Sequence, residues 1–239
     1  MSGGVDFTPE TRNAIFQQNL KDWCGPKGFY LARKLMRGGS FYLPQFHEMK
    51  TIFLHIPKSA GTSLGEALFG TGLTGHFDWR LYKAENRAAF RSYYKFCFVR
   101  EPIDRFLSAY NYLIGGGKAP YDAAMGLDVA KYGGINAFIE FGLERDRWSR
   151  LRHFRPQSLM VCDRDLSVQV DFVGRFENFD RDCQIVADAL GVKLAPPKSN
   201  VTPRKTVSFA DLSGSSLRRL RDIYRADFQA FRYTMADAA

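Results

Sequence analysis

Short apolar runs recur along the chain, and each precedes a segment with helical periodicity. The runs at Thr51–Leu54, Tyr94–Val99 and Val168–Phe176 are typical of buried strands. In the segments that follow, apolar residues recur every three or four positions, as on the buried face of a helix. Strands that alternate with helices predict an α/β fold, in which a central parallel sheet lies between two layers of helices.

Helical regions flank this alternating part at both ends. A helix is predicted over Thr8–Trp23, where a glycine-proline step follows it. A long last helix is predicted to begin at Asp211, because one apolar stripe continues at helical spacing through Leu217, Leu220, Tyr224, Phe228 and Phe231. We therefore expect an N-terminal helical and basic extension, residues 1–49, packed on a single domain, residues 50–239.

The loop after the first strand has the residues of an oxyanion-binding site. Its sequence, His55–Leu64, is HIPKSAGTSL, and a helix is predicted to follow it directly. The free N–H groups at a helix start, together with the helix dipole, favour a bound anion. Gly61 lets the backbone approach a ligand, and Lys58 adds a mobile cation. Thr62 and Ser63 add hydroxyl donors, so this P-loop-like strand-loop-helix unit predicts an anion site, with an ordinary strand-to-helix turn as the alternative.

The loop departs from the Walker A sequence of nucleotide kinases and ATPases. That motif places its lysine directly after the second glycine and follows it with a hydroxyl that holds magnesium. Here Lys58 precedes Gly61 by three residues. The spacing argues against a P-loop-like kinase, which stays an alternative that magnesium-dependent ATP binding would support.

A second candidate phosphate contact follows the second apolar run. Arg100 is predicted at the carboxyl end of that strand, where open α/β sheets bind ligands. Pro102 suits the first position of the next helix, which places Ser108 about two turns along it. An arginine and a serine so placed can share one phosphate. The alternative is that Arg100 pairs with a carboxylate such as Asp104, and that Ser108 is an ordinary helix serine.

Together the two segments resemble those of the sulfotransferases. HIPKSAGTSL is similar to the loop that binds the 5′-phosphosulfate of the donor 3′-phosphoadenosine 5′-phosphosulfate (PAPS), and VREPIDRFLSAY is similar to the 3′-phosphate segment. The resemblance implies that the 5′-phosphosulfate contacts are Lys58, Ser59, Gly61, Thr62 and Ser63. It also implies that Arg100 and Ser108 hold the 3′-phosphate, and that the donor binds without a metal.

Later segments resemble the carbohydrate O-sulfotransferases that act on glycosaminoglycans and related glycans. DFVGRFEN, Asp171–Asn178, and HFRPQ, His153–Gln157, are similar to segments of that group. His153 and Arg155 are therefore candidate acceptor contacts. In the same enzymes a threonine and a lysine three residues later contact the nucleotide, and the pair here is Thr202 and Lys205. The resemblance spans Thr51 to about Tyr233.

A sugar hydroxyl needs a general base, and histidine titrates nearest neutrality. The chain has four histidines, at positions 47, 55, 76 and 153. His76 resembles the catalytic histidine of a glycine-histidine step in glycosaminoglycan 2-O-sulfotransferases, although Thr74 stands where that pattern has a second histidine. His76 is the predicted base, with His153 and a carboxylate, Glu66 or Asp78, as alternatives.

Residues 118–160 are predicted to form a helical insertion on the acceptor side. The segment carries many aromatic residues and arginines: Tyr121, Tyr132, Phe138, Phe141, Trp148, Phe154, Arg145, Arg147, Arg150 and Arg152. Aromatic rings can stack on sugars and arginines bind carboxylates or sulfates, so the composition suits an anionic glycan. The alternative is a helical subdomain with a packed aromatic core and solvated arginines.

Composition and charge are consistent with this assignment. The 239 residues carry a formal net charge of +9, which favours anionic partners. The four cysteines form no CxxC pair, and no acidic cluster has metal-ligand spacing, so we expect neither a zinc site nor a bound metal. No apolar run is long enough for a membrane span, and the first residues, MSGGVDFTPE, have no signal-peptide pattern.

The membrane-anchored Golgi members of the resembled group differ from this chain, which we expect to be a cytoplasmic, bacterial-type relative or a trimmed catalytic domain. The predicted activity is transfer of the sulfuryl group from PAPS to a carbohydrate or glycan hydroxyl, with no nucleic-acid partner. A basic module that binds nucleic acid or another anionic polymer without catalysis stays a further alternative, which steep salt dependence would support.

Overall fold

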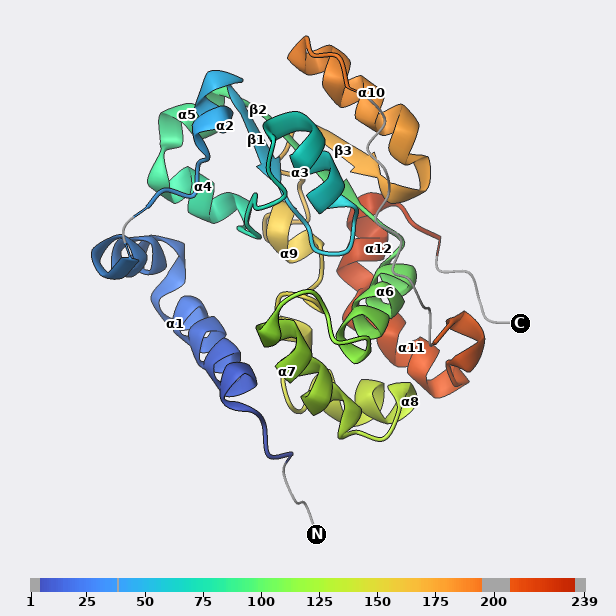
Figure 1. Ribbon diagram of the computed structural model, residues 1–239. Helices are drawn as coiled ribbons and strands as arrows, with labels where there is room; N and C mark the ends of the chain where they lie inside the picture. The colour runs from blue at the N-terminus through green and yellow to red at the C-terminus, as the bar shows by residue number, and fades with distance from the viewer. Residues whose placement is uncertain (1–4, 38, 195–206, 235–239) are drawn as a thin grey trace.

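The computed structural model describes residues 5–37, 39–194 and 207–234 of the chain (Figure 1). Its center is a parallel sheet of three strands in the order β1-β2-β3: β1 (Thr51–Leu54), β2 (Tyr94–Val99) and β3 (Phe172–Arg175). The register places Phe96 of β2 beside Phe53 on one side and Phe172 on the other. The predicted α/β fold with a central parallel sheet is confirmed.

The first two strands have the predicted bounds, and the third is shorter than predicted. Every residue of β1 and all but the first of β2 are buried, as is required of strands covered by helices on both faces. The third apolar run was expected to be extended from Val168. The structure instead pairs Val168 with Cys162 in an antiparallel bridge, and β3 begins only at Phe172.

Helices lie around the sheet, and a further group of helices lies on one side of it (Figure 1). The α-helices are α1 (Pro9–Arg37), α2 (Pro44–Glu48), α3 (Gly61–Phe69), α4 (Trp79–Glu85), α5 (Arg87–Ser92), α6 (Pro102–Ile114), α7 (Pro120–Ala130), α8 (Ile135–Ala137), α9 (Ser158–Val161), α10 (Phe179–Leu190), α11 (Gly214–Ile223) and α12 (Arg225–Phe231). A π-helix, η1 (Phe138–Gly142), continues α8, and 3₁₀ turns lie at η2 (Trp148–Arg150), η3 (Phe176–Asn178) and η4 (Phe209–Asp211).

The predicted last helix is two helices. The chain leaves helical geometry at Tyr224, between α11 and α12. Tyr224 is fully buried, and its hydroxyl donates to the backbone oxygen of Phe154, 2.7 Å away. The apolar stripe was therefore predicted correctly as a buried face. The break between α11 and α12 coincides with the bond from Tyr224 to Phe154, which the spacing of apolar residues does not reveal.

Two aromatic-rich cores hold the molecule together. One surrounds the sheet and includes Phe53 and Phe96. The other joins α6, α7, η1 and the last two helices, and in it Phe138, Trp148 and Phe154 are fully buried. For these three rings the alternative interpretation, a packed aromatic core, is therefore correct, and they are not free to stack on a sugar.

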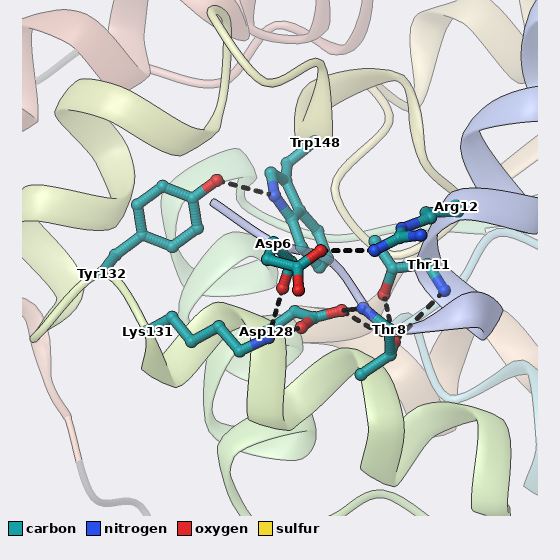
Figure 2. Close-up of polar contacts among 8 residues, drawn as sticks. All are labelled: Asp6, Thr8, Thr11, Arg12, Asp128, Lys131, Tyr132 and Trp148. Carbon is teal, nitrogen blue, oxygen red and sulfur yellow. Dashed lines mark hydrogen bonds and ion pairs between the residues drawn. The ribbon is translucent and has the colours of Figure 1, made fainter. Parts of the chain in front are cut away.

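The segment before α1 is bound to α7 (Figure 2). The buried carboxylate of Asp128 accepts hydrogen bonds from the backbone N–H of Thr8, at 2.8 Å, and from its hydroxyl, at 2.7 Å. Lys131 forms an ion pair with the other oxygen of Asp128, at 2.6 Å.

The expected break in α1 is present, because Gly25 adopts a non-helical conformation with φ of 66°.

Candidate functional site

The predicted oxyanion loop connects the end of β1 to the start of α3. Two non-glycine residues in it, Lys58 and Ala60, have left-handed backbone conformations, with φ of 69° and 60°. Such conformations are uncommon outside glycine and gather at ligand-binding turns. The N-cap residue of α3, Ala60, makes no side-chain cap hydrogen bond. A helix start without such a cap is typical of an anion site, so the predicted oxyanion loop stays a candidate.

A glycine is needed at position 61 for two reasons: the close approach of the loop to a ligand and the close contact with the His55 ring. A Cβ at Gly61 would lie 2.1 Å from Cδ2 of the buried His55 ring. His55 in turn lies 2.7 Å from the Thr74 hydroxyl through Nδ1, and its ring centroid is 4.2 Å from that of His76. The histidine ring therefore fixes the spacing between the start of α3 and the segment that carries His76.

Lys58 lies in a cationic environment. Its ammonium is 3.8 Å from the centroid of the Tyr112 ring, and no ion pair joins it to a carboxylate in the described parts of the chain. Burial and the neighbouring charges of Arg100 and Lys118 lower the pKa of Lys58 to about 8, while Asp122 opposes the shift. Gathered cations of this kind favour an anionic ligand.

Arg100 stands at the end of β2, where the sequence placed it. Its backbone N–H donates to Oε1 of Gln157 at 3.0 Å, and its carbonyl accepts from Nε2 of the same side chain at 2.8 Å. Its Nε donates to Asp104, 2.7 Å away, so the alternative carboxylate pairing is present in this ligand-free chain. Its Nη1 lies 3.5 Å from the Lys58 carbonyl, which brings the two predicted phosphate segments together.

The remaining predicted donor contacts differ in their surroundings. Ser108 lies half-buried on α6, as the helical spacing predicted. The Ser59 hydroxyl is buried and has no partner among the described residues, a costly arrangement that a hydrogen-bonding ligand would relieve. Thr62 and Ser63 lie in the first turn of α3. Thr202 and Lys205 lie outside the described residues.

His76, the predicted general base, is held by a hydrogen bond through one ring nitrogen. Its Nδ1 lies 2.9 Å from the backbone oxygen of His55. Because a carbonyl oxygen only accepts, Nδ1 carries the proton and neutral His76 presents Nε2 as a lone pair. Burial and the charge of Arg152 lower the pKa of His76 to about 4, although its bond to His55 and the charge of Asp122 oppose the shift. The imidazole is therefore neutral near pH 7, with its single N–H proton on Nδ1.

Asp78, an alternative base, is committed elsewhere. Its buried carboxylate pairs with Lys21 at 3.1 Å, Arg80 at 3.3 Å and Arg155 at 3.4 Å. Burial alone would raise the pKa of Asp78, but these cations hold it below the ordinary value. The predicted acceptor contact Arg155 thus has a structural partner in this network. Glu66, the other carboxylate considered, is exposed on α3.

His153 belongs to a buried polar cluster centred on Asp122. One oxygen of Asp122 lies 3.0 Å from Nε2 of His153 and 3.1 Å from Arg152, and the other accepts the Tyr112 hydroxyl at 2.6 Å. Nδ1 of His153 is buried and has no described partner. Burial lowers the pKa of His153 despite Asp122, so this second histidine is also kept neutral.

Sequence reasoning missed Tyr112 and Asp122. Tyr112 carries the Lys58 ammonium on its ring face, and Asp122 joins that tyrosine to His153. The available signal was weak: the three glycines after α6 allow the chain to turn back so that the start of α7 meets the end of α6. Gly117 shows this closeness, because a Cβ there would lie 2.2 Å from Cβ of Asp122.

Within the described residues, no group of three or more His, Cys, Asp or Glu side chains could hold a metal ion. The helices in the same part of the chain include none whose length and apolar character would suit a membrane crossing. The donor-side residues do fit an anionic nucleotide, on the chain's own geometry: an uncapped helix start, a left-handed loop, Lys58 without a carboxylate partner and an orphaned Ser59 hydroxyl.

Comparison with known proteins agrees with this geometry. Searches against curated proteins and against solved structures find no match. The family model described as the sulfotransferase family matches residues 45–234, well over half of the chain. That span contains the strand-loop-helix unit, Arg100, His76 and the Asp122 cluster, and the chain belongs to the sulfotransferase family.

Proposed function

We propose that this sulfotransferase uses PAPS as its donor and transfers the sulfuryl group to a hydroxyl of a carbohydrate, of the glycosaminoglycan type. The observation that carries the proposal is the hydrogen bond from Nδ1 of His76 to the backbone oxygen of His55, which leaves Nε2 unprotonated on a ring that contacts His55, three residues before Lys58. Family membership favours sulfuryl transfer over the phosphoryl transfer of a P-loop-like kinase and over a non-catalytic basic module.

In the proposed reaction, the acceptor oxygen forms a bond to sulfur as the bond from sulfur to the bridging phosphate oxygen breaks. Nε2 of His76 takes the proton of the acceptor hydroxyl. The electron pair of the broken bond stays on the 5′-phosphate of adenosine 3′,5′-bisphosphate. Lys58 and the N–H groups at the start of α3 stabilise that growing charge, an interaction that strengthens toward the transition state.

Arg100 has a different proposed part, which is to hold the 3′-phosphate of the donor. Its guanidinium is held by Asp104 and lies against the Phe176 ring, 4.2 Å from the centroid. Arginine binds phosphate through two parallel hydrogen bonds, so turning from Asp104 to a phosphate would exchange one anion for another. Ser108, farther along α6, would add a hydroxyl donor.

A carbohydrate acceptor is supported by the HFRPQ segment and by charge. Arg152 joins the Asp122 cluster and keeps 41% of its side chain exposed, so it can meet a ligand from solvent. Arg152 and His153 both contact Asp122, and the charge of Arg152 contributes to the lowered pKa of His76, which supports a cationic acceptor side near the proposed base. An acceptor with a carboxylate or sulfate near the reacting hydroxyl fits these cations.

The pH dependence of kcat/KM tests the assigned protonation states. His76 must be neutral, so the rate falls as pH drops through its pKa of about 4. Lys58 must be charged, so the rate falls as pH rises through about 8. We expect a broad plateau between these limits, measured with the donor at low concentration. A basic limb at pH 10 or above in the free enzyme would contradict the role of Lys58.

Donor identity is tested by thermal shift. Ligand at about 100 times its dissociation constant stabilises by about 2.7 kcal/mol, which is several degrees in Tm for a domain of this size. We expect a shift with adenosine 3′,5′-bisphosphate and none with ATP, with or without magnesium. Radiolabelled transfer from PAPS to a panel of neutral and anionic glycans then identifies the acceptor. A shift with magnesium ATP alone would overturn the proposal in favour of a kinase.

A further inference from the structure

The ring of Tyr112 carries the Lys58 ammonium. The 3.8 Å between Nζ of Lys58 and the ring centroid is well inside the range of a cation–π contact. Tyr112 comes from α6 and Lys58 from the loop before α3, so the contact joins two elements far apart in sequence. A desolvated ammonium gains more from such a ring than an exposed one does.

The ring is itself fixed at its polar end. The Tyr112 hydroxyl donates to Oδ2 of Asp122 at 2.6 Å and accepts from the backbone N–H of Lys118 at 3.0 Å. Asp122 is 4% exposed and is held from its other oxygen by His153 and Arg152. Burial and the bond to Asp122 raise the pKa of Tyr112 to about 12, so the phenol stays neutral and remains a donor.

We propose that Tyr112 and Asp122 are positioning residues for Lys58: the phenol ring holds the ammonium against the donor site, and the carboxylate orients the phenol. This inference rests on the proposed role of Lys58. It adds a link between the two sides of the site, because Asp122 contacts His153 while its phenol partner contacts Lys58. The charged groups that face Lys58 are Arg100 after β2, Lys118 before α7 and Asp122 on α7.

The chain contains a second tyrosine–carboxylate pair for comparison. The Tyr132 hydroxyl donates to Asp146 at 2.6 Å, the same length as in the Tyr112 pair, and also accepts from the Trp148 indole at 3.2 Å. Tyr132 follows the end of α7, near the N-terminal segment (Figure 2), whereas Asp122 lies near the start of that helix. The second pair has the same chemistry, and no lysine of the described residues lies over the Tyr132 ring, so it serves as the matched control.

The experiment measures the titration of Lys58 directly. The full chain, without nucleotide, is acetylated briefly at a series of pH values, and mass spectrometry gives the rate at Lys58. The rate of the wild-type chain is expected to reach half its maximum near pH 8. Tyr112→Leu removes the ring and Asp122→Asn removes the charge, so both should lower that midpoint, by about one pH unit for the ring. Tyr112→Phe keeps the ring but loses the hydrogen bond to Asp122, so it should lower the midpoint less than Tyr112→Leu does, whereas Tyr132→Leu should leave the midpoint near 8.

Activity is measured on the same variants. Tyr112→Leu and Asp122→Asn are expected to lower kcat at pH 8 at least tenfold, and to move the basic limb of the rate profile to lower pH together with the acetylation midpoint. The inference is overturned if both variants keep the wild-type midpoint, or if Tyr132→Leu shifts it equally. Lys58→Ala separates the two claims. Full activity in that variant would defeat the proposed function itself. An inactive Lys58→Ala variant, together with unchanged acetylation midpoints in Tyr112→Leu and Asp122→Asn, would defeat only this inference.

Discussion

The proposed donor side and the proposed acceptor side of the site are built in different ways. On the proposed donor side, Lys58 to Ser63 form one loop and helix start, and Arg100 follows β2, the strand paired with β1. The acceptor side depends on Asp122, whose partners Tyr112 and His153 are 10 and 31 residues away. Backbone geometry makes the first, and side-chain contacts between distant segments make the second.

The two sides also differ in charge. Lys58 has no carboxylate partner in the described chain, so its charge is left for a ligand. On the acceptor side, Asp122 gathers Arg152, His153 and Tyr112 around one buried carboxylate, and these contacts hold its pKa below the ordinary value although burial alone would raise it. The donor side is thus prepared for an incoming anion, whereas the acceptor side is already neutralised in part.

The largest effect is expected on the donor side, from Lys58→Ala. Removing the cation that stabilises the leaving nucleotide should lower kcat about 10²- to 10³-fold, the usual cost of losing one charge-stabilising donor. Lys83→Ala is the matched control, because Lys83 also lies over an aromatic ring, that of Trp79, at 5.1 Å. A fall of less than threefold in kcat would contradict the donor-side assignment.

Arg100→Ala tests whether the second donor segment binds phosphate. We expect the Kd of adenosine 3′,5′-bisphosphate, measured by calorimetry, to rise about 10- to 100-fold, because charge-assisted hydrogen bonds to phosphate are lost. Arg150→Ala, at a half-exposed arginine paired with Asp22, serves as control. If Arg100 serves only to pair with Asp104, the variant will unfold more easily but bind the nucleotide as tightly as the wild type.

Gly61→Ala probes the close contact between the loop and His55. The new Cβ would lie 2.1 Å from the ring, so we expect a loss of about 1–3 kcal/mol in the free energy of unfolding. Gly214 also occupies the first position of a helix, but a Cβ there would meet only Arg218, at 3.6 Å. Gly214→Ala should therefore be neutral or slightly stabilising. Equal urea midpoints for the two variants would argue against the contact.

Acid should lower the free energy of unfolding, because buried histidines resist protonation in the folded chain. Burial lowers the pKa of both His55 and His76, so below pH 6.5 the unfolded chain binds protons that the folded chain refuses. Stability is then lost as pH falls, and His76 alone accounts for up to about 2 kcal/mol at pH 5 because its pKa is about 4. Urea unfolding at pH 7 and 5 measures the loss, and His76→Asn should reduce it. An unchanged free energy of unfolding at pH 5 would show that the histidines are not buried as described.

The strands and the loop of the proposed donor side could be predicted because their sequence signals are local. The strands Thr51–Leu54 and Tyr94–Val99 were predicted with their observed bounds, since each is a continuous apolar run ended by a polar loop. Val168 shows the limit of such runs, because an apolar residue there pairs with Cys162 outside the sheet. Tyr112 and Asp122 carry no local pattern. A helix tyrosine and a helix aspartate are ordinary until the fold places them 2.6 Å apart.

The most direct test of the account is a single-turnover transfer from PAPS with His76→Ala, with nucleotide binding measured on the same protein. His76 is proposed to act on the acceptor proton and not on the donor. The account predicts that His76→Ala binds adenosine 3′,5′-bisphosphate as the wild type does, while the transfer rate falls about 10²- to 10⁴-fold. Transfer at the wild-type rate by a folded, nucleotide-binding His76→Ala variant would contradict it.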